Sequence, residues 1–526
     1  MTTDLSTEAA TDASDKLDAR VLIVAGVVVL GSIMSILDVT VVNVAMATFM
    51  KTFGKSQAQV AWVATGYTLA LATVIPMTGW AAERFGTKRL YMLAILLFAA
   101  GSALCATAPN LETLIVFRVL QGLGGGMLMP LGMTIMTRAA GPERVGRVMA
   151  VLGIPMLLGP ILGPILGGWL IDIASWHWIF LVNVPLGLIA LVYAWRVLEK
   201  DNPQSSETFD FVGMLLLSPG LACLLYGVSS IPAAQTNHHT MWTKTVVIPA
   251  IIGIVLVAAF VPWALRKANI HPLMDLRLFK DRNMTVSVIS IILFAIAFFG
   301  ASLLLPTYFQ EVRNASPLKS GVLLAPQGLG AMLTMPVAGV LADKLGAGKV
   351  VIPGIVLIAA SMVMWTQVSD TSSYWYLLSA LLVMGLGMGC TMMPLYSAAM
   401  ATLRDHTIAR GSTLLNIVQQ IAASIGTALF AVLLTNQERT HDSVIASQLA
   451  GTADGDKGLL DSLLTNAGID PANLPRLLAR APHDLASSFG GVFVVGAILV
   501  AVVLVPAFFL PRSKSEELGE KPVVMH

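Results

Sequence analysis

The stretch that decides the fold is GWAAERFGTKR, residues 79–89, a short charged segment between apolar runs near 58–78 and 90–108. Each run is long enough to cross a bilayer, which takes about 20 apolar residues. Gly79 and Gly86 allow a tight reversal of the chain, and the bases beside them face phospholipid head groups. The segment therefore predicts a hairpin of two membrane-spanning helices.

The same pattern returns as GVLADKLGAGK, residues 339–349, with glycine, acid, base and glycine at the same internal spacing. A second motif is also repeated. Gly122-Leu123-Gly124 and Gly385-Leu386-Gly387 each precede a Met-Pro pair. Two separate motifs thus recur at nearly the same offset, which indicates a duplicated membrane bundle. Equivalent halves of this kind place a binding site at their interface, near the bilayer midplane.

Composition supports this fold class. The chain has 526 residues, of which 56% are hydrophobic and 12% charged, and a mean hydropathy of +0.78. A soluble domain carries about 25% charged residues, so the chain is predicted to be an all-α polytopic membrane protein. A net charge of +2 gives no reason to expect a nucleic-acid partner. The three cysteines fall in predicted spans, so neither a disulfide framework nor a metal site is expected.

Hydropathy predicts fourteen spans, near 21–46, 58–78, 90–108, 111–137, 145–172, 177–195, 211–231, 245–264, 284–308, 318–338, 350–369, 374–399, 408–435 and 488–511. The expected organisation is a disordered cytoplasmic tail (1–20), a six-helix bundle (21–195), an inserted helix pair (211–264), a second six-helix bundle (284–511) and a tail (512–526). One long outer loop, 436–487, interrupts the second bundle. Leucine pairs within that loop hint at a short amphipathic helix.

The distribution of bases predicts the orientation. If both termini are cytoplasmic, five bases lie in short outer loops: Lys51, Lys55, Lys244, Arg313 and Lys319. Seventeen then lie in short inner loops: Arg84, Lys88, Arg89, Arg138, Arg144, Arg147, Arg196, Lys200, Arg266, Lys267, Arg277, Lys280, Arg282, Lys344, Lys349, Arg404 and Arg410. Because bases are retained on the inner side, both termini are expected in the cytoplasm.

Asp38 is the first candidate for chemistry. It lies seventeen residues into the first span, so roughly 25 Å from the inner end of that helix. A membrane-embedded acid is costly and is by default a functional hypothesis. Burial disfavours its charged form, which suits a proton carrier. The alternative is a structural acid hydrogen-bonded to a neighbouring helix.

Arg118 is the one base in the middle of a predicted span, and Gln121 and Gly122 share its helix face. The second half has Leu381 and Met384 where the repeat would place Arg118 and Gln121. This asymmetry assigns energy coupling to the first half. The alternative is that Arg118 only pins its helix to a neighbour.

The fifth span reads GPILGPILGG, residues 159–168. Gly159, Gly163 and Gly167, followed by Gly168, form a flat strip for close helix contact. Pro160 and Pro164 remove backbone donors and bend the helix. A plain packing motif is the simpler explanation.

Two further sets of residues are candidates for substrate contact and gating. Polar and aromatic side chains in the spans could line a cavity, although most such groups simply bond neighbouring helices: Trp62, Tyr67, Gln121, Gln327, Asn416, Gln419 and Gln420. The repeated charged turns could hold the cytoplasmic side closed through Gly79, Glu83, Arg84, Gly86, Lys88 and Asp343. The chain has no phosphate-binding loop and no hydrolase motif, so ATP use, a cofactor and enzymatic activity are not expected.

These residues together resemble the fourteen-span drug/proton antiporter branch of the major facilitator superfamily. The turn at 79–89 resembles the family's loop between spans 2 and 3, with Glu83 where aspartate is usual and Thr87 where arginine is usual. LDVTVVNVA at 37–45, WHWIFLVNVPLG at 176–187 and the glycine-proline strip add to the likeness. The resemblance covers about residues 21–511. It implies coupling through Asp38 and Arg118, with the strip as the antiport motif.

The resulting prediction is a proton-coupled antiporter that exports amphipathic drugs across the bacterial cytoplasmic membrane as a monomer, with protons and membrane lipids as its other partners. Within transport, the alternative is an exporter of one endogenous lipid or metabolite. From another class, the alternative is a membrane sensor that transports nothing. Neither tail resembles an output domain, which speaks against a sensor.

Overall fold

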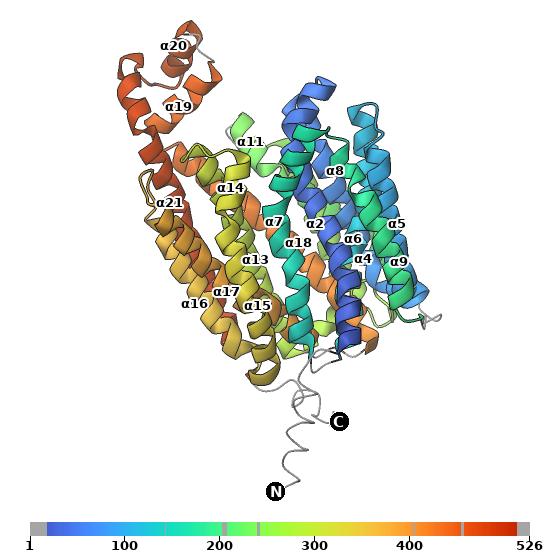
Figure 1. The fold of residues 1–526 in the computed structure, drawn as a ribbon. Helices are drawn as coiled ribbons and strands as arrows, with labels where there is room; N and C mark the ends of the chain where they lie inside the picture. Colours follow the sequence, from blue (N-terminus) through green and yellow to red (C-terminus); the bar gives the residue numbers. More distant parts are fainter. Residues whose placement is uncertain are drawn as a thin grey trace.

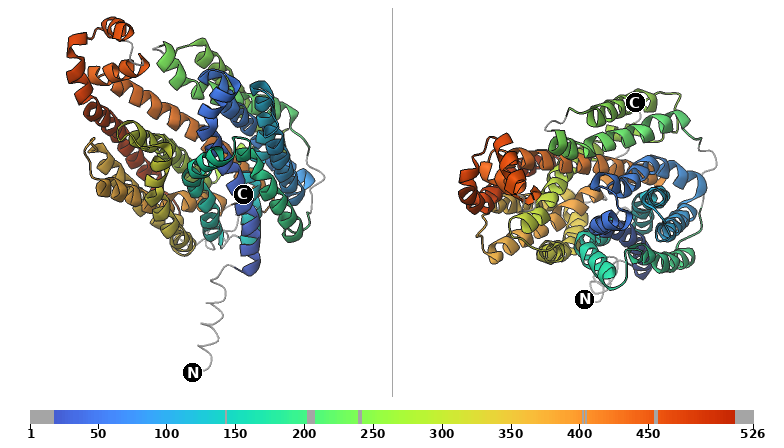
Figure 2. Two further views of the ribbon diagram at one scale, coloured as in Figure 1. Left: turned by 45° about the horizontal axis from the view of Figure 1, so that its top comes forward. Right: turned by 90° about the horizontal axis from the view of Figure 1, so that it is seen from above.

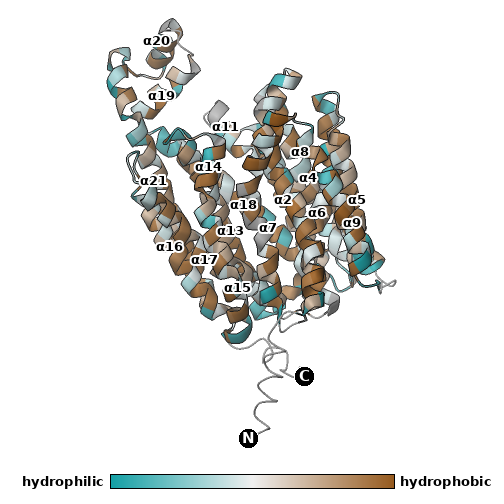
Figure 3. Ribbon diagram, viewed as in Figure 1, coloured by the Kyte–Doolittle hydropathy of each residue, from teal (hydrophilic) through white to brown (hydrophobic). Residues whose placement is uncertain are grey.

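The structure, a computed structural model, describes residues 18–141, 144–201, 208–238, 242–401, 403, 405–453 and 457–512. Within these residues all regular structure is helical. The long helices run side by side in one bundle, with the short helices of the outer loop projecting from one end (Figure 1). Apolar residues cover the sides of the bundle and polar residues gather at its ends, as a bilayer requires (Figure 3).

The first part of the chain forms α2 (Ala19–Phe53), α3 (Gln57–Val60), α4 (Trp62–Phe85), α5 (Thr87–Cys105), α6 (Leu111–Ala140), α7 (Val145–Ile173), α8 (Trp178–Leu181) and α9 (Asn183–Val197). The middle part forms α10 (Phe211–Ser229), α11 (Ile231–His238), α12 (Lys244–Ala264) and η2 (Leu276–Lys280). The last part forms α13 (Arg282–Glu311), α14 (Pro317–Leu323), α15 (Ala325–Leu345), α16 (Ala347–Thr366), α17 (Tyr374–Met400), α18 (Asp405–Glu438), α19 (Asp442–Thr452), α20 (Lys457–Asn466), η3 (Pro471–Asn473) and α21 (Leu474–Ala507).

The all-α membrane fold is confirmed. Twelve helical segments of the described residues are long and apolar enough to cross a membrane, and each coincides with a predicted span. The two other predicted spans, 58–78 and 145–172, coincide with α4, of 24 residues, and α7, of 29 residues. The short helix predicted within the 436–487 loop is also confirmed, because the leucine pairs of 459–464 lie in α20.

The two repeated turns have nearly the same backbone conformation. Gly86, between α4 and α5, has φ 97° and ψ 141°, and Gly346, between α15 and α16, has φ 87° and ψ 144°. Each donates its N–H to the carbonyl four residues earlier, at Ala82 and Ala342. Side chains other than glycine rarely adopt this positive φ, which explains why both copies of the turn carry glycine there.

Helix packing repeats between the two parts of the bundle. In the first part α4 and α5 pack on α6, α2 packs on α7, and α5 packs on α9. In the second part α15 and α16 pack on α17, α13 packs on α18, and α16 packs on α21. The same set of neighbours, in the same chain order, is what a duplicated six-helix unit produces.

The two parts meet along two seams, α7 against α15 and α17, and α18 against α4 and α6. The inserted pair, α10 and α12, lies outside the second seam, where α10 contacts both α4 and α18 (Figure 2, right). Asp210 stabilises the base of this pair by accepting hydrogen bonds from Gly213 N–H at 2.8 Å and Trp263 Nε1 at 2.8 Å. The insertion thus covers one side of the interface between the parts.

Candidate functional site

Asp38 lies near the middle of α2 and is buried, with 2% of its surface exposed. Its Oδ2 accepts a hydrogen bond from Nη1 of Arg118 at 2.5 Å, and Arg118 is 1% exposed. The predicted proton carrier and the predicted membrane base therefore form a buried ion pair. Because desolvating such a pair costs several kcal/mol per ion, the surrounding groups must satisfy both charges.

Gln121, one turn after Arg118 on α6, completes the pair on one side. Its Oε1 accepts from Arg118 Nη1 at 2.7 Å, and its Nε2 donates to Asp38 Oδ1 at 2.8 Å. The guanidinium also donates from Nε to the Val63 carbonyl of α4 at 3.2 Å. The Tyr67 ring lies 4.1 Å from the guanidinium carbon, close enough for a cation–π contact. Three helices, α2, α4 and α6, thus enclose the charges.

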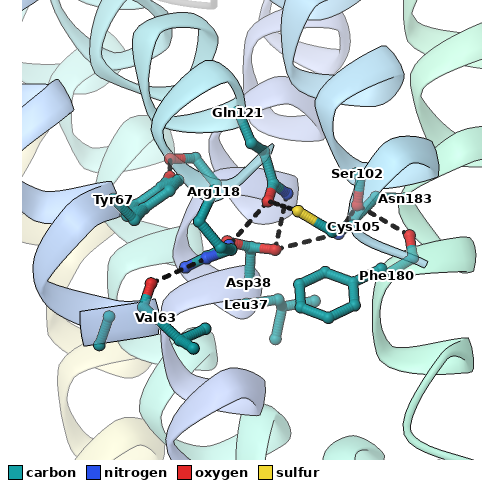
Figure 4. A network of polar contacts seen from close by, with 12 residues as sticks. Leu37, Asp38, Val63, Tyr67, Ser102, Cys105, Arg118, Gln121, Phe180 and Asn183 are labelled. Carbon is teal, nitrogen blue, oxygen red and sulfur yellow. Dashed lines mark hydrogen bonds and ion pairs between the residues drawn. The ribbon is translucent and has the colours of Figure 1, made fainter. Parts of the chain in front are cut away.

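Asn183, the first residue of α9, joins the network from the opposite side (Figure 4). Its Nδ2 lies 3.4 Å from Asp38 Oδ1 and 3.2 Å from the Ser102 hydroxyl of α5. Ser102 donates to the Phe180 carbonyl at 2.8 Å, and the Cys105 thiol donates to Gln121 Oε1 at 3.6 Å. Pro185, two residues after Asn183, has no N–H to donate to the carbonyl four residues earlier, at Leu181, and α8 and α9 are separated at Val182.

The glycine strip of α7 packs on the part of α2 that carries Asp38. A Cβ added at Gly159 would lie 2.1 Å from Ile36, one at Gly163 would lie 1.9 Å from the Thr40 hydroxyl, and one at Gly167 would lie 3.0 Å from Val41. Thr40 also donates to the Gly159 carbonyl at 3.2 Å. At Gly168 nothing lies within 4 Å. The side chains of Pro160 and Pro164 lie outside the described part of α7.

The first charged turn forms a contact within its own part of the bundle. Glu83, 7% exposed, accepts from Arg138 Nη2 at 2.6 Å, and Arg138 Nη1 donates to the Thr87 hydroxyl at 2.9 Å. Asp201 accepts from the N–H groups of Lys88 and Arg89 at 2.8 and 3.0 Å and so caps α5. A cavity of about 470 Å³ opens beside Glu83, Arg138 and Lys88. Arg84 is half-buried in the last turn of α4.

The second charged turn reaches across the two parts. Asp343 accepts from Gly146 N–H at 2.8 Å and Arg147 N–H at 3.3 Å, in the first turn of α7, and lies 3.5 Å from Arg147 Nε. Its carboxylate therefore sits at the positive end of the α7 dipole. Gly79 lies close to Arg410 of α18, since a Cβ there would be 3.3 Å from that residue's Cα. These contacts close the bundle at the end that carries both turns.

The residues predicted to contact substrate are spread over the molecule. Tyr67 and Gln121 belong to the charge network. Trp62 is 41% exposed and stacks on Tyr226 of α10, with 5.6 Å between ring centroids. Asn416 donates to the Ser412 carbonyl at 2.8 Å, and Gln419 accepts from the Tyr396 hydroxyl at 2.5 Å.

Gln327 and Gln420 complete that set, and both are half-buried. Gln327 lies in α15 against Gly385, and Gln420 lies in α18 near Leu221 of α10. The role of each in substrate contact remains a prediction.

A sequence comparison decides the family. The pattern of the Major Facilitator Superfamily matches residues 28–427. The chain belongs to that superfamily. A "Multidrug resistance protein B homolog" of Mycobacterium tuberculosis is 52% identical over 513 residues, covering 95% of this chain and 92% of its own length. "Multidrug export protein EmrB" of Escherichia coli is 30% identical over 437 residues, covering 82% and 83%.

Solved structures share the fold. The human organic anion transporter MFSD10 has a TM-score of 0.57 at 14% identity, covering 92% of this chain and all of its own. The proton:xylose symporter XylE has a TM-score of 0.55 at 14% identity, covering 95% and 98%. As a member of the Major Facilitator Superfamily, this chain is a multi-span transporter of small molecules.

Several partners of the predicted residues were missed from the sequence. Asn183 lies inside the WHWIFLVNVPLG motif, so a polar side chain beside a helix-breaking proline within an apolar span was the available signal. Ser102 and Arg138 carried no comparable signal, because each is unremarkable in its own helix. Gly146 acts through its backbone N–H, which the sequence does not distinguish from any other helix start.

Proposed function

We propose that this transporter is a proton-coupled antiporter that exports amphipathic drugs or toxic small molecules across the bacterial cytoplasmic membrane. The observation that carries the proposal is the buried Asp38–Arg118 pair, enclosed by Gln121, Val63 and Tyr67 at membrane depth. The names of the similar multidrug proteins support the substrate class. The orientation that agrees with the basic residues has both termini in the cytoplasm.

Protonation of Asp38 is the coupling step in this scheme. The charged acid holds Arg118 and ties α2 to α6, whereas a neutral acid attracts the guanidinium far less, so the two forms favour different helix arrangements. Arg118 keeps Gln121, the Val63 carbonyl and the Tyr67 ring as partners when Asp38 becomes neutral. The buried guanidinium therefore keeps partners in both states, which keeps the neutral form of Asp38 accessible.

The glycine strip of α7 transmits the change. Its contacts with Ile36, Thr40 and Val41 flank Asp38, so a shift of α2 moves α7 directly. At its other end α7 holds Asp343 of α15 through two backbone N–H groups. One continuous helix, α7, thus connects the proposed coupling site to the contact between the two parts. Alternating access requires such a connection between the two parts of the bundle.

Reconstituted vesicles test the proposal. Purified protein is inserted into liposomes, a pH gradient is imposed, and uphill movement of a panel of cationic dyes, neutral drugs and lipids is recorded. Gradient-driven movement of several dyes, lost in Asp38→Asn, is the expected result. Movement of a single lipid or metabolite alone would favour the dedicated exporter. Binding without any movement in a protein that is stably inserted would favour the sensor.

A further inference from the structure

We propose that Asn183 is the group that accommodates the coupling proton, by turning its side-chain amide so that its oxygen accepts a hydrogen bond from protonated Asp38. This inference rests on the proposed proton coupling at Asp38. Asn183 would be a positioning residue that makes the neutral acid stable at depth, in contrast to Gln121, which holds the ionised acid. The amides of Gln121 and Asn183 both contact Oδ1 of Asp38. Their other hydrogen-bond partners determine which of the two amides can turn over.

The carboxylate is arranged for its ionised form. Oδ2 receives Arg118 Nη1, and Oδ1 receives the NH₂ groups of Gln121 at 2.8 Å and Asn183 at 3.4 Å. A proton on Oδ2 would point at a cationic donor. A proton on Oδ1 would point at two amide NH₂ groups, which are donors. It gains an acceptor only if one amide turns over, so that its oxygen occupies the position of its nitrogen. Neutral Asp38 therefore requires one amide to turn over.

Gln121 is held in one orientation. Its Oε1 accepts from Arg118 Nη1 at 2.7 Å and from the Cys105 thiol at 3.6 Å. Turning this amide would place its NH₂ against the guanidinium, which has donors only. Gln121 consequently stays a donor to Asp38 whatever the protonation state of the acid.

Asn183 is held by a group that can either donate or accept a hydrogen bond. The second partner of its Nδ2 is the Ser102 hydroxyl at 3.2 Å, and a hydroxyl both donates and accepts. When Asn183 turns, its Oδ1 takes the place of Nδ2, accepts the proton of Asp38 and accepts from Ser102. Ser102 then rotates its hydrogen away from the Phe180 carbonyl, its present acceptor at 2.8 Å. The O–H bond forms on Asp38 from a proton of the medium, and no other covalent bond changes.

No other titratable group takes this role among the described residues. Arg118 of α6, Tyr67 of α4 and Cys105 of α5 surround the carboxylate. The Tyr67 hydroxyl already lies 3.2 Å from the Ser35 hydroxyl of α2, and the other contacts of the three residues are those given above. On α7 the titratable side chains are Arg147 and Asp172, near its two ends, and on α9 they are Tyr193, which lies against Gly26, and Arg196 in the last turn. α8 carries none.

The experiment follows the infrared band of the protonated Asp38 carboxyl against pH in purified protein, with the band assigned by its absence in Asp38→Asn. Asn183→Leu removes the acceptor of the neutral acid, whereas from the ionised acid it removes only the weaker donor at 3.4 Å. The loss to the neutral acid is therefore the larger, and the midpoint is expected to move to lower pH by about one unit, a tenfold change in the protonation constant. Gln121→Leu is the matched control, because it removes only a donor to the ionised acid and should move the midpoint to higher pH. The pH profile of transport should shift in the same directions.

An unchanged or higher midpoint in Asn183→Leu would overturn this inference and leave the proposed function standing. If wild-type protein shows no Asp38 band at any pH, the proposed function fails and this inference fails with it. Each variant is compared at equal amounts of monodisperse protein. If Asn183→Leu does not fold, Asn183→Val removes the same amide with a smaller side chain and is judged by the same criterion.

Discussion

At the scale of single residues, the proposed coupling site at Asp38 and Arg118 balances the cost of desolvating two charges against their attraction. Asp38 and Arg118 are almost fully buried, and the ionised carboxylate would be strongly destabilised there without its counter-ion. Breaking such a pair by removing one partner typically costs about 3–5 kcal/mol, because the other charge stays buried without compensation. If the proposed coupling holds, stability and function depend on the same two side chains, and substitutions can separate the two contributions.

Asp38→Asn should abolish gradient-driven export while leaving substrate binding. The amide has the shape of the acid and remains neutral at every pH, so it cannot alternate between the two charge states. Uphill transport into vesicles is expected to fall to the level of empty liposomes, with substrate affinity within a few-fold of wild type. Asp172→Asn, at the exposed C-terminal end of α7, is the control and should transport normally. Wild-type uphill transport by Asp38→Asn would remove the acid from the mechanism.

Arg118→Leu should destabilise the protein more than it destabilises an Asp38→Asn background. In the single variant a buried carboxylate loses its counter-ion, at a cost of about 3–5 kcal/mol. In the double variant no charge remains to be compensated, so much of that loss is recovered. Unfolding in detergent, measured for all four combinations, gives the coupling energy. Equal losses in both backgrounds would mean that the two side chains do not share an ion pair.

At the scale of helices, close packing of α7 on α2 explains the density of glycine in 159–168. A Cβ at Gly163 would overlap the Thr40 hydroxyl, whereas one at Gly168 would meet nothing within 4 Å. The two positions lie in the same helix and the same motif, and they differ in their surroundings. Substitutions at Gly163 and Gly168 therefore test whether transport needs close contact between α7 and α2 or only small residues in this motif.

Gly163→Ala should slow transport at least tenfold, because it forces α7 away from the segment that carries Asp38. Gly168→Ala adds the same methyl group where there is room, so its turnover should stay within about twofold of wild type. Both rates are measured in vesicles at matched protein amounts and saturating substrate. Equal turnover in the two variants would show that close α2–α7 packing does not limit the cycle.

At the scale of the whole molecule, the two parts are held together at one end by contacts of Asp343 with the start of α7. Hydrogen bonds to a charged group are worth about 1.5–3 kcal/mol, enough to shift a two-state equilibrium tenfold or more. Because Asp343 bonds across the parts, its contribution should appear in the balance between conformations, and substrate contacts should be unaffected.

Asp343→Asn should shift the population towards a state open at the end that carries the two repeated turns. Spin labels on Arg89→Cys and Lys349→Cys, exposed positions beside the two repeated turns, report the separation of the parts. A longer distance population, increased tenfold relative to the closed one, is expected, with substrate affinity little changed. Asp172→Asn again serves as the control. An unchanged distance distribution together with lost binding would place Asp343 in the substrate site.

Labelling of introduced cysteines tests the orientation of the whole molecule. Ser447, exposed on α19, lies in the outer loop, and Lys200, exposed after α9, lies at the opposite end with the repeated turns. Ser447→Cys should react with an impermeant thiol reagent in intact cells, and Lys200→Cys only after lysis. The unsubstituted protein, with its three native cysteines, sets the background. The reverse pattern would invert the proposed topology.

The sequence alone determined the membrane class, the duplicated turns and the two charged members of the buried Asp38–Arg118 pair. Each of these rests on a local property: length of apolar runs, a glycine that must adopt positive φ, and the cost of a charge at membrane depth. The same argument located the glycine strip, because close helix contact needs small side chains at a four-residue spacing.

Only the tertiary structure decided the partners. Asn183 reaches Asp38 from α9, Arg138 reaches Glu83 from α6, and Asp343 meets the backbone of α7 in the other part of the bundle. It also placed Trp62 against the inserted pair and Gln121 inside the charge network. In a membrane bundle nearly every face of a helix is apolar, so periodicity does not reveal which neighbour a given face will meet. That choice depends on packing among distant helices, which no single stretch of sequence encodes.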